Sequence, residues 1–479
     1  MRSIVSNVIH LLYSTVLSRI LFAAALIVLA QYLNAREYGM FSVALAFSMV
    51  MGFFTDAGVS NTVIRESSKT SANIVKLLSS YIKLRLILLF GTLFVSVIFI
   101  ELFYEKEGLK EVFYYMLVPV ITGLALQNIS ITYFQMVEKM HNVGLIRIWS
   151  SVACVVFVVI GMLLKLPVTI IALLFGFSYV LGGLYSLLIL FKHTRVHLRE
   201  AFEKKILFQL SPFIVSGLLM MLLPQLGPLV LEKTLLLHYV GLFAIAYRIP
   251  SALYQVPGVV AGAFYPVLFR YWNSGDREKH LNLNITQLKV MGLIGIIITI
   301  PLFHMSTEVI RLLFGKEWLS ASEPLRIVSI VLFLQSLSFA LADGLTTKGL
   351  QTRRTCIQLV AVLLAIVVYY SLSLRFGLYG AAYSVVFIEC FAVICFWLAN
   401  PSWFLIGKRV LLPYLVTGVV SLYVTSSFID QSIFSAVLNL FIILFLPLLD
   451  GELRSVILNR YKISQTQQVL QYKIKEKRL

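Results

Sequence analysis

Fourteen stretches of about twenty mostly apolar residues follow one another between Ile9 and Asp450, joined by short polar connections. A helix of about 20 residues is long enough to cross the hydrocarbon core of a bilayer. The composition agrees, because 59% of the 479 residues are hydrophobic and only 13% are charged, whereas a soluble protein carries about 25% charged residues. Continuous apolar runs favour helices over the short alternating strands of a membrane β-barrel. The sequence therefore predicts an all-α polytopic membrane protein.

We expect about 14 transmembrane helices. Their expected spans are residues 9–32, 40–63, 80–104, 112–135, 145–166, 169–191, 208–231, 242–268, 288–312, 325–347, 355–374, 378–398, 410–428 and 433–450. With the N-terminus inside, most of the 40 Lys and Arg residues fall on inner loops and the tail. Because basic loops are retained on the cytoplasmic side, we expect both termini in the cytoplasm.

Two similar turns about two hundred residues apart indicate an internal repeat. Tyr38-Gly39-Met40-Phe41 and Tyr239-Val240-Gly241-Leu242-Phe243 each stand at the outer end between the first two helices of a half. Six helices separate the copies, so both begin on the inside, as in a parallel repeat of two six-helix lobes. The expected organisation is an N-terminal lobe (residues 1–191), an inter-lobe linker (192–207), a C-terminal lobe (208–399), two appended helices (400–450) and a tail (451–479).

The formal net charge of +18 is explained by this topology and by attraction to anionic lipid headgroups. Aromatic and basic clusters that would grip nucleic-acid bases are missing from the sequence, so we expect no nucleic-acid partner. The tail mixes apolar and basic residues, and much of it is expected to lie as an amphipathic helix on the inner membrane surface.

The connections leave no room for a soluble catalytic domain, because the longest two are under twenty residues. The sequence has no HExxH zinc motif, no GxSxG nucleophile elbow and no GxxxxGK phosphate loop. The four cysteines lie inside apolar stretches at no metal-ligand spacing. We therefore expect no catalytic residue, no metal site and no cofactor, and a transporter with a central cavity of alternating access is the natural interpretation.

Several short motifs resemble those of one transporter family. They are Tyr38-Gly39-Met40-Phe41, Asp56-Ala57-Gly58, Arg65-Glu66, residues 247–266, Leu313-Phe314-Gly315 and Leu378-Tyr379-Gly380. In their order and with this topology, they resemble polysaccharide-transporter flippases of the Wzx type. That family belongs to the superfamily of drug-exporting MATE carriers and lipid II flippases, so the resemblance implies a MATE-like fold.

The resemblance also implies a function. Such a protein sits in the bacterial plasma membrane and turns an undecaprenyl-pyrophosphate-linked oligosaccharide from the cytoplasmic to the outer leaflet, for O-antigen (lipopolysaccharide), capsule or exopolysaccharide synthesis. Its partners would be the lipid-linked oligosaccharide, membrane lipids, and glycan polymerase and chain-length machinery. Relatives often carry an acid in the second half of the seventh helix, where this chain has Gln225. A carboxylate ion site on that helix is therefore not expected.

Arg19 is the first candidate for the substrate site. It lies near the middle of the first span and shares a helix face with Thr15, Ala23 and Ala30. A charge at this depth costs about 2.5–3.5 kcal/mol on insertion scales, and a guanidinium can bind phosphate oxygens with two parallel hydrogen bonds. We expect Arg19 to contact the diphosphate, with a structural ion pair to Asp56 as the alternative.

Further polar residues within the spans are candidates for contacts with the substrate. Arg248 and Gln255 share a face of the eighth span, where Arg248 would bind an anion or extend to the outer headgroups. Pro250 and Pro257 are expected to bend that helix. Asp56, Asn128 and Gln135, the last two on a polar face with Thr132, could contact sugar hydroxyls or hydrogen-bond between helices.

Glu389 lies in an apolar setting near the middle of the twelfth span. A carboxyl there could couple transport to the proton gradient, or could be a permanently neutral acid bonded to a neighbouring helix. Asp343, near the inner end of the tenth span, is expected to be solvated.

Three other functions remain as alternatives. A MATE-like multidrug or small-molecule exporter would be expected to show an acid-lined cavity, whereas the deepest charge here is Arg19. A membrane-embedded glycan polymerase or ligase ordinarily needs a large outer loop. A structural scaffold would not need polar stripes within the membrane.

Overall fold

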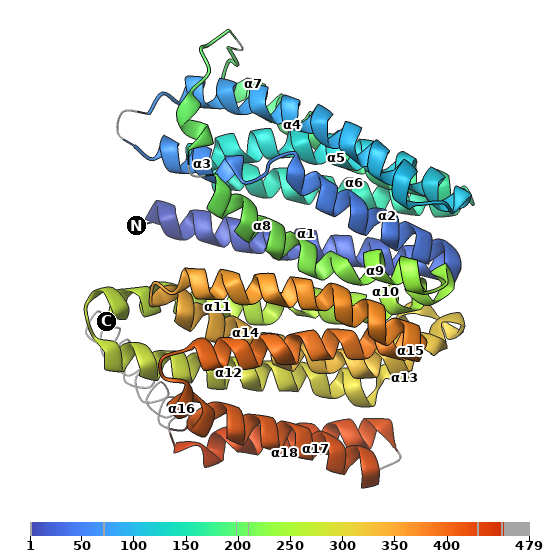
Figure 1. Cartoon of the computed structure of the whole chain (residues 1–479), viewed down its shortest axis with the longest axis vertical. Helices are drawn as coiled ribbons and strands as arrows, with labels where there is room; N and C mark the ends of the chain where they lie inside the picture. Colours follow the sequence, from blue (N-terminus) through green and yellow to red (C-terminus); the bar gives the residue numbers. More distant parts are fainter. Residues whose placement is uncertain are drawn as a thin grey trace, which may run out of the picture. The chain divides into compact units, whose positions relative to one another are not determined.

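The computed structural model describes residues 2–69, 72–197, 199–208, 210–428, 431–451 and 454, and these residues are almost entirely helical (Figure 1). The α-helices are α1 (Arg2–Tyr32), α2 (Ala35–Phe54), α3 (Val59–Ser67), α4 (Ile74–Phe103), α5 (Glu107–Met136), α6 (Met140–Leu163), α7 (Val168–His193), α8 (Ser211–Leu222), α9 (Leu226–Thr234), α10 (Leu237–Leu253), α11 (Gln255–Asn273), α12 (Arg277–His304), α13 (Ser306–Phe314), α14 (Ser322–Thr347), α15 (Gln351–Ala399), α16 (Trp403–Ile406), α17 (Leu412–Phe428) and α18 (Ser432–Leu449). Short helical turns are η1 (Lys204–Leu207), η2 (Leu223–Gln225), η3 (Lys316–Ala321) and η4 (Gly407–Leu411). The amphipathic tail expected at residues 451–479 lies outside the described residues, apart from Gly451 and Arg454.

Twelve of the described helices are long and apolar enough to cross a membrane. One of them, the 49-residue α15, combines two helices that meet at Gly377, and Ser432–Phe445 forms a further, shorter apolar helix. The expected count of about 14 spans is therefore consistent with the structure, and the chain is a multi-pass membrane protein.

The two arms of α15 fold back on one another at Gly377, whose φ of 57° is in the region that favours glycine. A Cβ on Gly380 would lie only 1.9 Å from the carbonyl oxygen of Leu372. The Ser384 hydroxyl donates to the carbonyl of Val368 at 3.2 Å. These contacts make the region an antiparallel hairpin, which the sequence predicted as two separate spans.

Several expected spans are interrupted. The second divides into α2 and α3, with positive φ at both Ala57 (47°) and Gly58 (77°). The seventh is interrupted by η2, which contains Pro224. The eighth divides at Tyr254, between α10 and α11, which confirms the disruption expected from Pro250 and Pro257.

The chain forms two compact units. Unit 1 comprises Met1–Gln255, Thr307–Val328 and Gln358–Ile388, and unit 2 comprises Val256–Ser306, Ser329–Ile357 and Glu389–Leu479. In unit 1, α5 packs on α7, α1 on α6, and α2 on α10; in unit 2, α12 packs on α17 and α18 (Figure 1). The lobe boundaries at residues 191 and 208 rest on the sequence repeat and stay a prediction.

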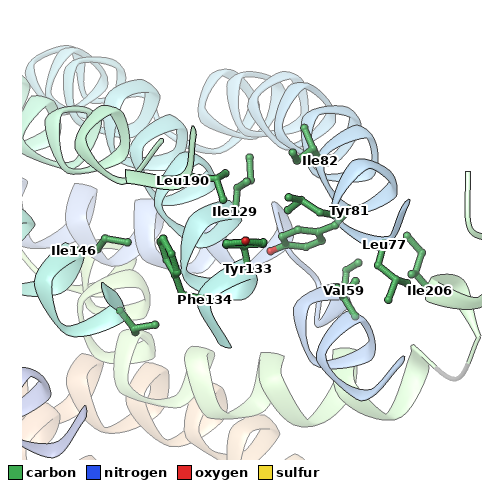
Figure 2. Packing of buried hydrophobic residues seen from close by; sticks show 13 residues of the cluster. Val59, Leu77, Tyr81, Ile82, Ile129, Tyr133, Phe134, Ile146, Leu190 and Ile206 are labelled. Carbon is green, nitrogen blue, oxygen red and sulfur yellow. The ribbon is translucent and has the colours of Figure 1, made fainter. Parts of the chain in front are cut away.

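A buried cluster in unit 1 joins α3, α4, α5, α6, α7 and η1, as Figure 2 shows. Its members are Val59, Val63, Leu77, Leu78, Tyr81, Ile82, Ile129, Tyr133, Phe134, Val143, Ile146, Leu190 and Ile206. Ile206 belongs to the expected inter-lobe linker, which is further held by an ion pair between Lys76 Nζ and Glu203 Oε2 at 3.0 Å. This ion pair lowers the pKa of Glu203. The expected linker is therefore packed within unit 1, against α3 and α4.

Candidate functional site

Two arginines from neighbouring helices of unit 1 lie close together. Arg19 is on α1 and Arg147 is on α6, and their charges lie within electrostatic range of one another. The Arg147 guanidinium donates from Nη1 to the hydroxyl of Thr15 at 2.8 Å, one turn before Arg19 on α1. The polar face expected around Thr15 and Arg19 thus includes a second cation that the sequence analysis did not single out.

Within the described part of the chain, this pair lacks a neutralising acid. Among the residues that the structure describes, no carboxylate lies within ion-pairing distance of either Arg19 or Arg147. Arg147 is half-buried and Arg19 is exposed in the protein alone. Two like charges repel one another, and holding them together without a counterion is unfavourable unless an anion binds there. The arrangement is typical of a site for an anionic group.

The α10 side of unit 1 contributes a third arginine. Arg248 lies on α10 within electrostatic range of Tyr179 on α7, and Tyr254, at the end of α10, is within electrostatic range of Arg19. The Nε of Arg248 is buried and has no hydrogen-bond partner in the described structure. A buried donor without a partner is costly, so Arg248 retains its place among the substrate candidates.

A different arginine, Arg85 on α4, is fully neutralised. Its side chain is 0% exposed, and Nη1 pairs with Asp56 Oδ1 at 2.5 Å. Nε and Nη2 donate to the carbonyls of Ala125 and Leu124 on α5, at 3.2 and 3.3 Å. The hydroxyls of Tyr81 and Ser60 donate to Asp56 at 2.8 and 2.6 Å. This network ties α3, α4 and α5 to the break that follows α2.

The expected alternative of an Arg19–Asp56 ion pair is therefore wrong. Asp56 pairs with Arg85, which is 29 positions away, and its two oxygens already accept hydrogen bonds. Arg85 was overlooked because the apolar stretch around it outweighs one charge in a hydropathy reading. An ionisable residue inside a span is a warning in itself, and applied to residues 80–104 and 145–166 it would have found both Arg85 and Arg147.

The remaining glycan candidates are less constrained. Asn128 and Gln135 are half-buried on α5, and their side chains have no hydrogen-bond partner among the described residues. Thr132, between them, instead donates to the hydroxyl of Tyr81 at 3.2 Å. The side chain of Gln255 lies outside the described part of the structure.

Two acids in unit 2 are held by amide side chains. Glu389 Oε1 accepts from Gln335 Nε2 at 3.0 Å, so a helix-to-helix hydrogen bond on this carboxyl is present. Asp343 is only 8% exposed and accepts from Gln287 Nε2 at 2.8 Å. The expectation that Asp343 is solvated was wrong, because α14 turns this residue towards α12 rather than towards water.

Comparison with known proteins supports the expectation that this chain is a flippase or transporter. The model of the family described as "Polysaccharide biosynthesis protein" matches residues 4–272. No curated protein matches the sequence. Several solved structures share the fold.

The chain is similar to the lipid II flippase MurJ in an inward closed conformation, with a TM-score of 0.71 and 17% identity over 91% of this chain and 98% of that one. It is also similar to a multidrug resistance MATE family transporter of the MOP superfamily. The inward-facing structure gives a TM-score of 0.69 and 15% identity, over 81% of this chain and 96% of that one. The outward-facing structure gives 0.57 and 17%, over 83% and 94%.

These similarities concern flippases and transporters rather than enzymes, and at such identities the structural matches establish the fold alone. The family match covers more than half of the chain and agrees with the motifs around Gly39 and Asp56. The chain belongs to the polysaccharide biosynthesis protein family of Wzx-type flippases, and it shares its fold with the lipid II flippase MurJ and the MATE family transporter.

Proposed function

We propose that this protein moves an undecaprenyl-pyrophosphate-linked oligosaccharide from the cytoplasmic to the outer leaflet by alternating access. In this proposal Arg19 and Arg147 bind the diphosphate, and Arg248 provides a further positively charged contact for this anionic group. Asn128, Gln135 and Gln255 are the candidates for the sugar hydroxyls. Asp56 is assigned to packing, because Arg85 already neutralises it.

The observation that carries the proposal is the pair of unneutralised guanidinium groups on α1 and α6. A diphosphate carries negative charge on two adjacent phosphates, and two neighbouring guanidiniums match it in charge and in hydrogen-bond donors. The Thr15 hydroxyl orients one of the two guanidinium groups by accepting a hydrogen bond from Arg147. Two cations repel a cationic drug, so the site favours an anionic substrate over the usual substrates of a multidrug exporter.

The cellular setting is part of the same proposal. We place the protein in the bacterial plasma membrane with both termini in the cytoplasm, because basic residues concentrate on one set of loops. Its product would feed O-antigen, capsule or exopolysaccharide assembly, and a glycan polymerase with its chain-length machinery would be the partner that receives it.

The test is a flipping assay in proteoliposomes that contain a fluorescent lipid-diphosphate oligosaccharide, with the leaflet read from quenching by an impermeant reagent. Arg19→Ala and Arg147→Ala should each slow flipping about 10- to 100-fold, because a charge-assisted hydrogen bond contributes about 1.5–3 kcal/mol. Arg19→Lys should lie between. Arg375→Ala removes an exposed arginine of α15 and is the matched control, which should flip normally.

Protein yield and thermal stability of each variant should match those of the parent, since neither arginine forms an ion pair with a described residue. Full flipping by folded Arg19→Ala and Arg147→Ala variants would remove the diphosphate role. Equal flipping of a neutral isoprenoid glycan that lacks phosphate would remove the substrate class.

A further inference from the structure

The first turns of α2 and α10 meet in unit 1 through two glycines. Gly39 is the fifth residue of α2, and Gly241 is the fifth residue of α10. A Cβ built on Gly39 would lie 2.0 Å from the carbonyl oxygen of Leu237, the first residue of α10. A Cβ built on Gly241 would lie 1.9 Å from the carbonyl oxygen of Ala35, the first residue of α2. The two helices therefore touch backbone to backbone.

The contact is reciprocal. The built Cβ of each glycine would also lie 3.1 Å from the backbone nitrogen of the other. Each glycine hydrogen in the Cβ position points at a carbonyl of the partner helix, a geometry that suits weak Cα–H···O bonds. Gly39 and Gly241 are also equivalent positions of the two repeated turns, Tyr38-Gly39-Met40-Phe41 and Tyr239-Val240-Gly241-Leu242-Phe243. The two copies of the repeated turn thus contact each other where α2 and α10 meet.

Other contacts of unit 1 join the same ends of these halves. Gln31 Nε2, at the end of α1, donates to the carbonyl of Leu313 in α13 at 2.7 Å. The ring of Tyr38 packs edge-on against Trp318 of η3, with centroids 5.7 Å apart. Gln31 ends the first expected span on the outer side, and Tyr38, Leu313 and Trp318 lie on connections expected at the outer face. We therefore assign the closed contact to that side.

A buried acid strengthens this end. Glu232 at the end of α9 is only 4% exposed and pairs with Lys106 before α5 and with Lys233, each at 3.0 Å. The Lys233 ammonium also lies 4.0 Å from the ring centre of Tyr104. The connection between α4 and α5 is thereby fixed to the seventh span, on the C-terminal side of the repeat.

We propose that Gly39 and Gly241 are the closing seam of an outer gate, which α2 and α10 shut by direct backbone contact and open by separating. The proposal rests on the alternating-access function above. Because the atoms opposite each glycine belong to backbone carbonyls, a side chain cannot be accommodated by a rotamer change. A methyl group at either position therefore acts against the closed state alone and leaves the open state free of conflict.

The test uses a reporter that measures gate opening without measuring transport. Ser42 lies one turn after Gly39 on the same face of α2 and is 3% exposed. In a background without the four native cysteines, Ser42→Cys should resist an impermeant thiol reagent. Gly39→Ala or Gly241→Ala should raise its labelling rate about tenfold or more, because an open minor state is ordinarily populated at about 0.1–10%.

Gly52→Ala is the matched control. It adds the same methyl group to the same helix, but the atom opposite is the end of the flexible Leu124 side chain, at 2.9 Å. The control should therefore keep Ser42→Cys protected. Fast labelling in the parent, no increase in either gate variant, or an equal increase in Gly52→Ala would each overturn the proposal.

A second measurement leaves both glycines in place, in case the gate variants do not fold. Gln31→Cys and Leu313→Cys are joined by a short, reducible bifunctional thiol reagent across the closed end. The cross-link should stop flipping, and its reduction should restore it; unchanged flipping in fully cross-linked protein would refute the gate. If the labelling pattern holds while the lipid-diphosphate glycan is not flipped, the gate stands and the proposed substrate falls.

Discussion

Two environments of arginine side chains in unit 1 differ in whether an acid neutralises the charge. Arg85 is sealed in packing, where Asp56, Tyr81 and two carbonyls of α5 occupy its donors. The guanidinium groups of Arg19 and Arg147 lie near one another, and among the described residues their one hydrogen-bond partner is the hydroxyl of Thr15, which accepts from Arg147. A guanidinium cannot lose its proton in a protein. The environment of Arg85 therefore supplies its counterion internally, whereas no described residue neutralises Arg19 and Arg147, and we propose that the substrate does so.

The two environments predict different effects when an arginine is removed. A buried ion pair need not stabilise a fold in net terms, but removal of one partner leaves a charge uncompensated and is strongly destabilising. The loss of a cation from an unneutralised pair relieves repulsion instead. Arg85 should thus be needed for folding, and Arg19 and Arg147 for transport.

The largest expected effect is on stability, from Arg85→Ala. The variant leaves Asp56 without its cation, and it should lose about 3–5 kcal/mol of stability, seen as a large drop in thermal unfolding temperature and in the yield of detergent-purified protein. The double variant Asp56→Asn, Arg85→Met removes both charges and should recover much of this loss. An Arg85→Ala protein as stable as the parent would erase the distinction between the two environments.

The carboxyl of Glu389 in unit 2 likewise lies within the membrane-spanning part of the chain. Glu389 accepts a hydrogen bond from Gln335 and has no cation within ion-pairing distance in the described structure. If it carries the coupling proton, Glu389→Gln should abolish most of the sensitivity of flipping to an uncoupler.

Gln335→Met is the matched control for this variant, because it removes the hydrogen bond and keeps the carboxyl. It should remain sensitive to the uncoupler. Full uncoupler-sensitive flipping by Glu389→Gln would assign the acid to a structural bond between α14 and α15.

A smaller effect is expected from Thr15→Val. The change keeps the volume and removes the hydroxyl that accepts from Arg147, so one hydrogen bond of about 1 kcal/mol is lost from the positioning of the guanidinium. Flipping should fall about fivefold, with the loss mainly in the apparent affinity for the substrate. Combined with Arg147→Ala, the substitution should add little, whereas independent effects would show that Thr15 does not act through Arg147.

The smallest effect concerns Lys348, which unlike arginine can lose its proton. Burial lowers its pKa to about 8, and the ammonium donates to Asn400 Oδ1 at 2.7 Å. An unfolded lysine titrates near about 10.4, so between about pH 8 and 10.4 the unfolded state binds more protons. The stability should rise with pH across that window.

Lys348→Met should flatten this rise in the thermal unfolding temperature, whereas Lys316→Met, at an exposed position, should leave it unchanged. A stability profile that is flat in the parent would show that Lys348 titrates as it does in water.

Much of the fold followed from local sequence features. Apolar length identified the spans, and Pro250 and Pro257 identified the break at Tyr254. Short motifs indicated the family, and Arg19 was chosen for its depth in the first span. Arg85 was overlooked, and Asp56 was given the wrong partner. The periodicity along one helix does not show which side chains of a neighbouring helix lie next to it.

The sequence by itself determined that this chain crosses the membrane many times and belongs to the flippase family, because the length and polarity of each segment are properties of consecutive residues. Only the tertiary structure decided which charges are neutralised. Arg85 finds Asp56 across 29 positions, and Arg147 finds Thr15 across 132. The tertiary structure also brought Gly39 against the first turn of α10. The physical reason is that electrostatic and steric contacts depend on distance through space, which is set by the packing of whole helices.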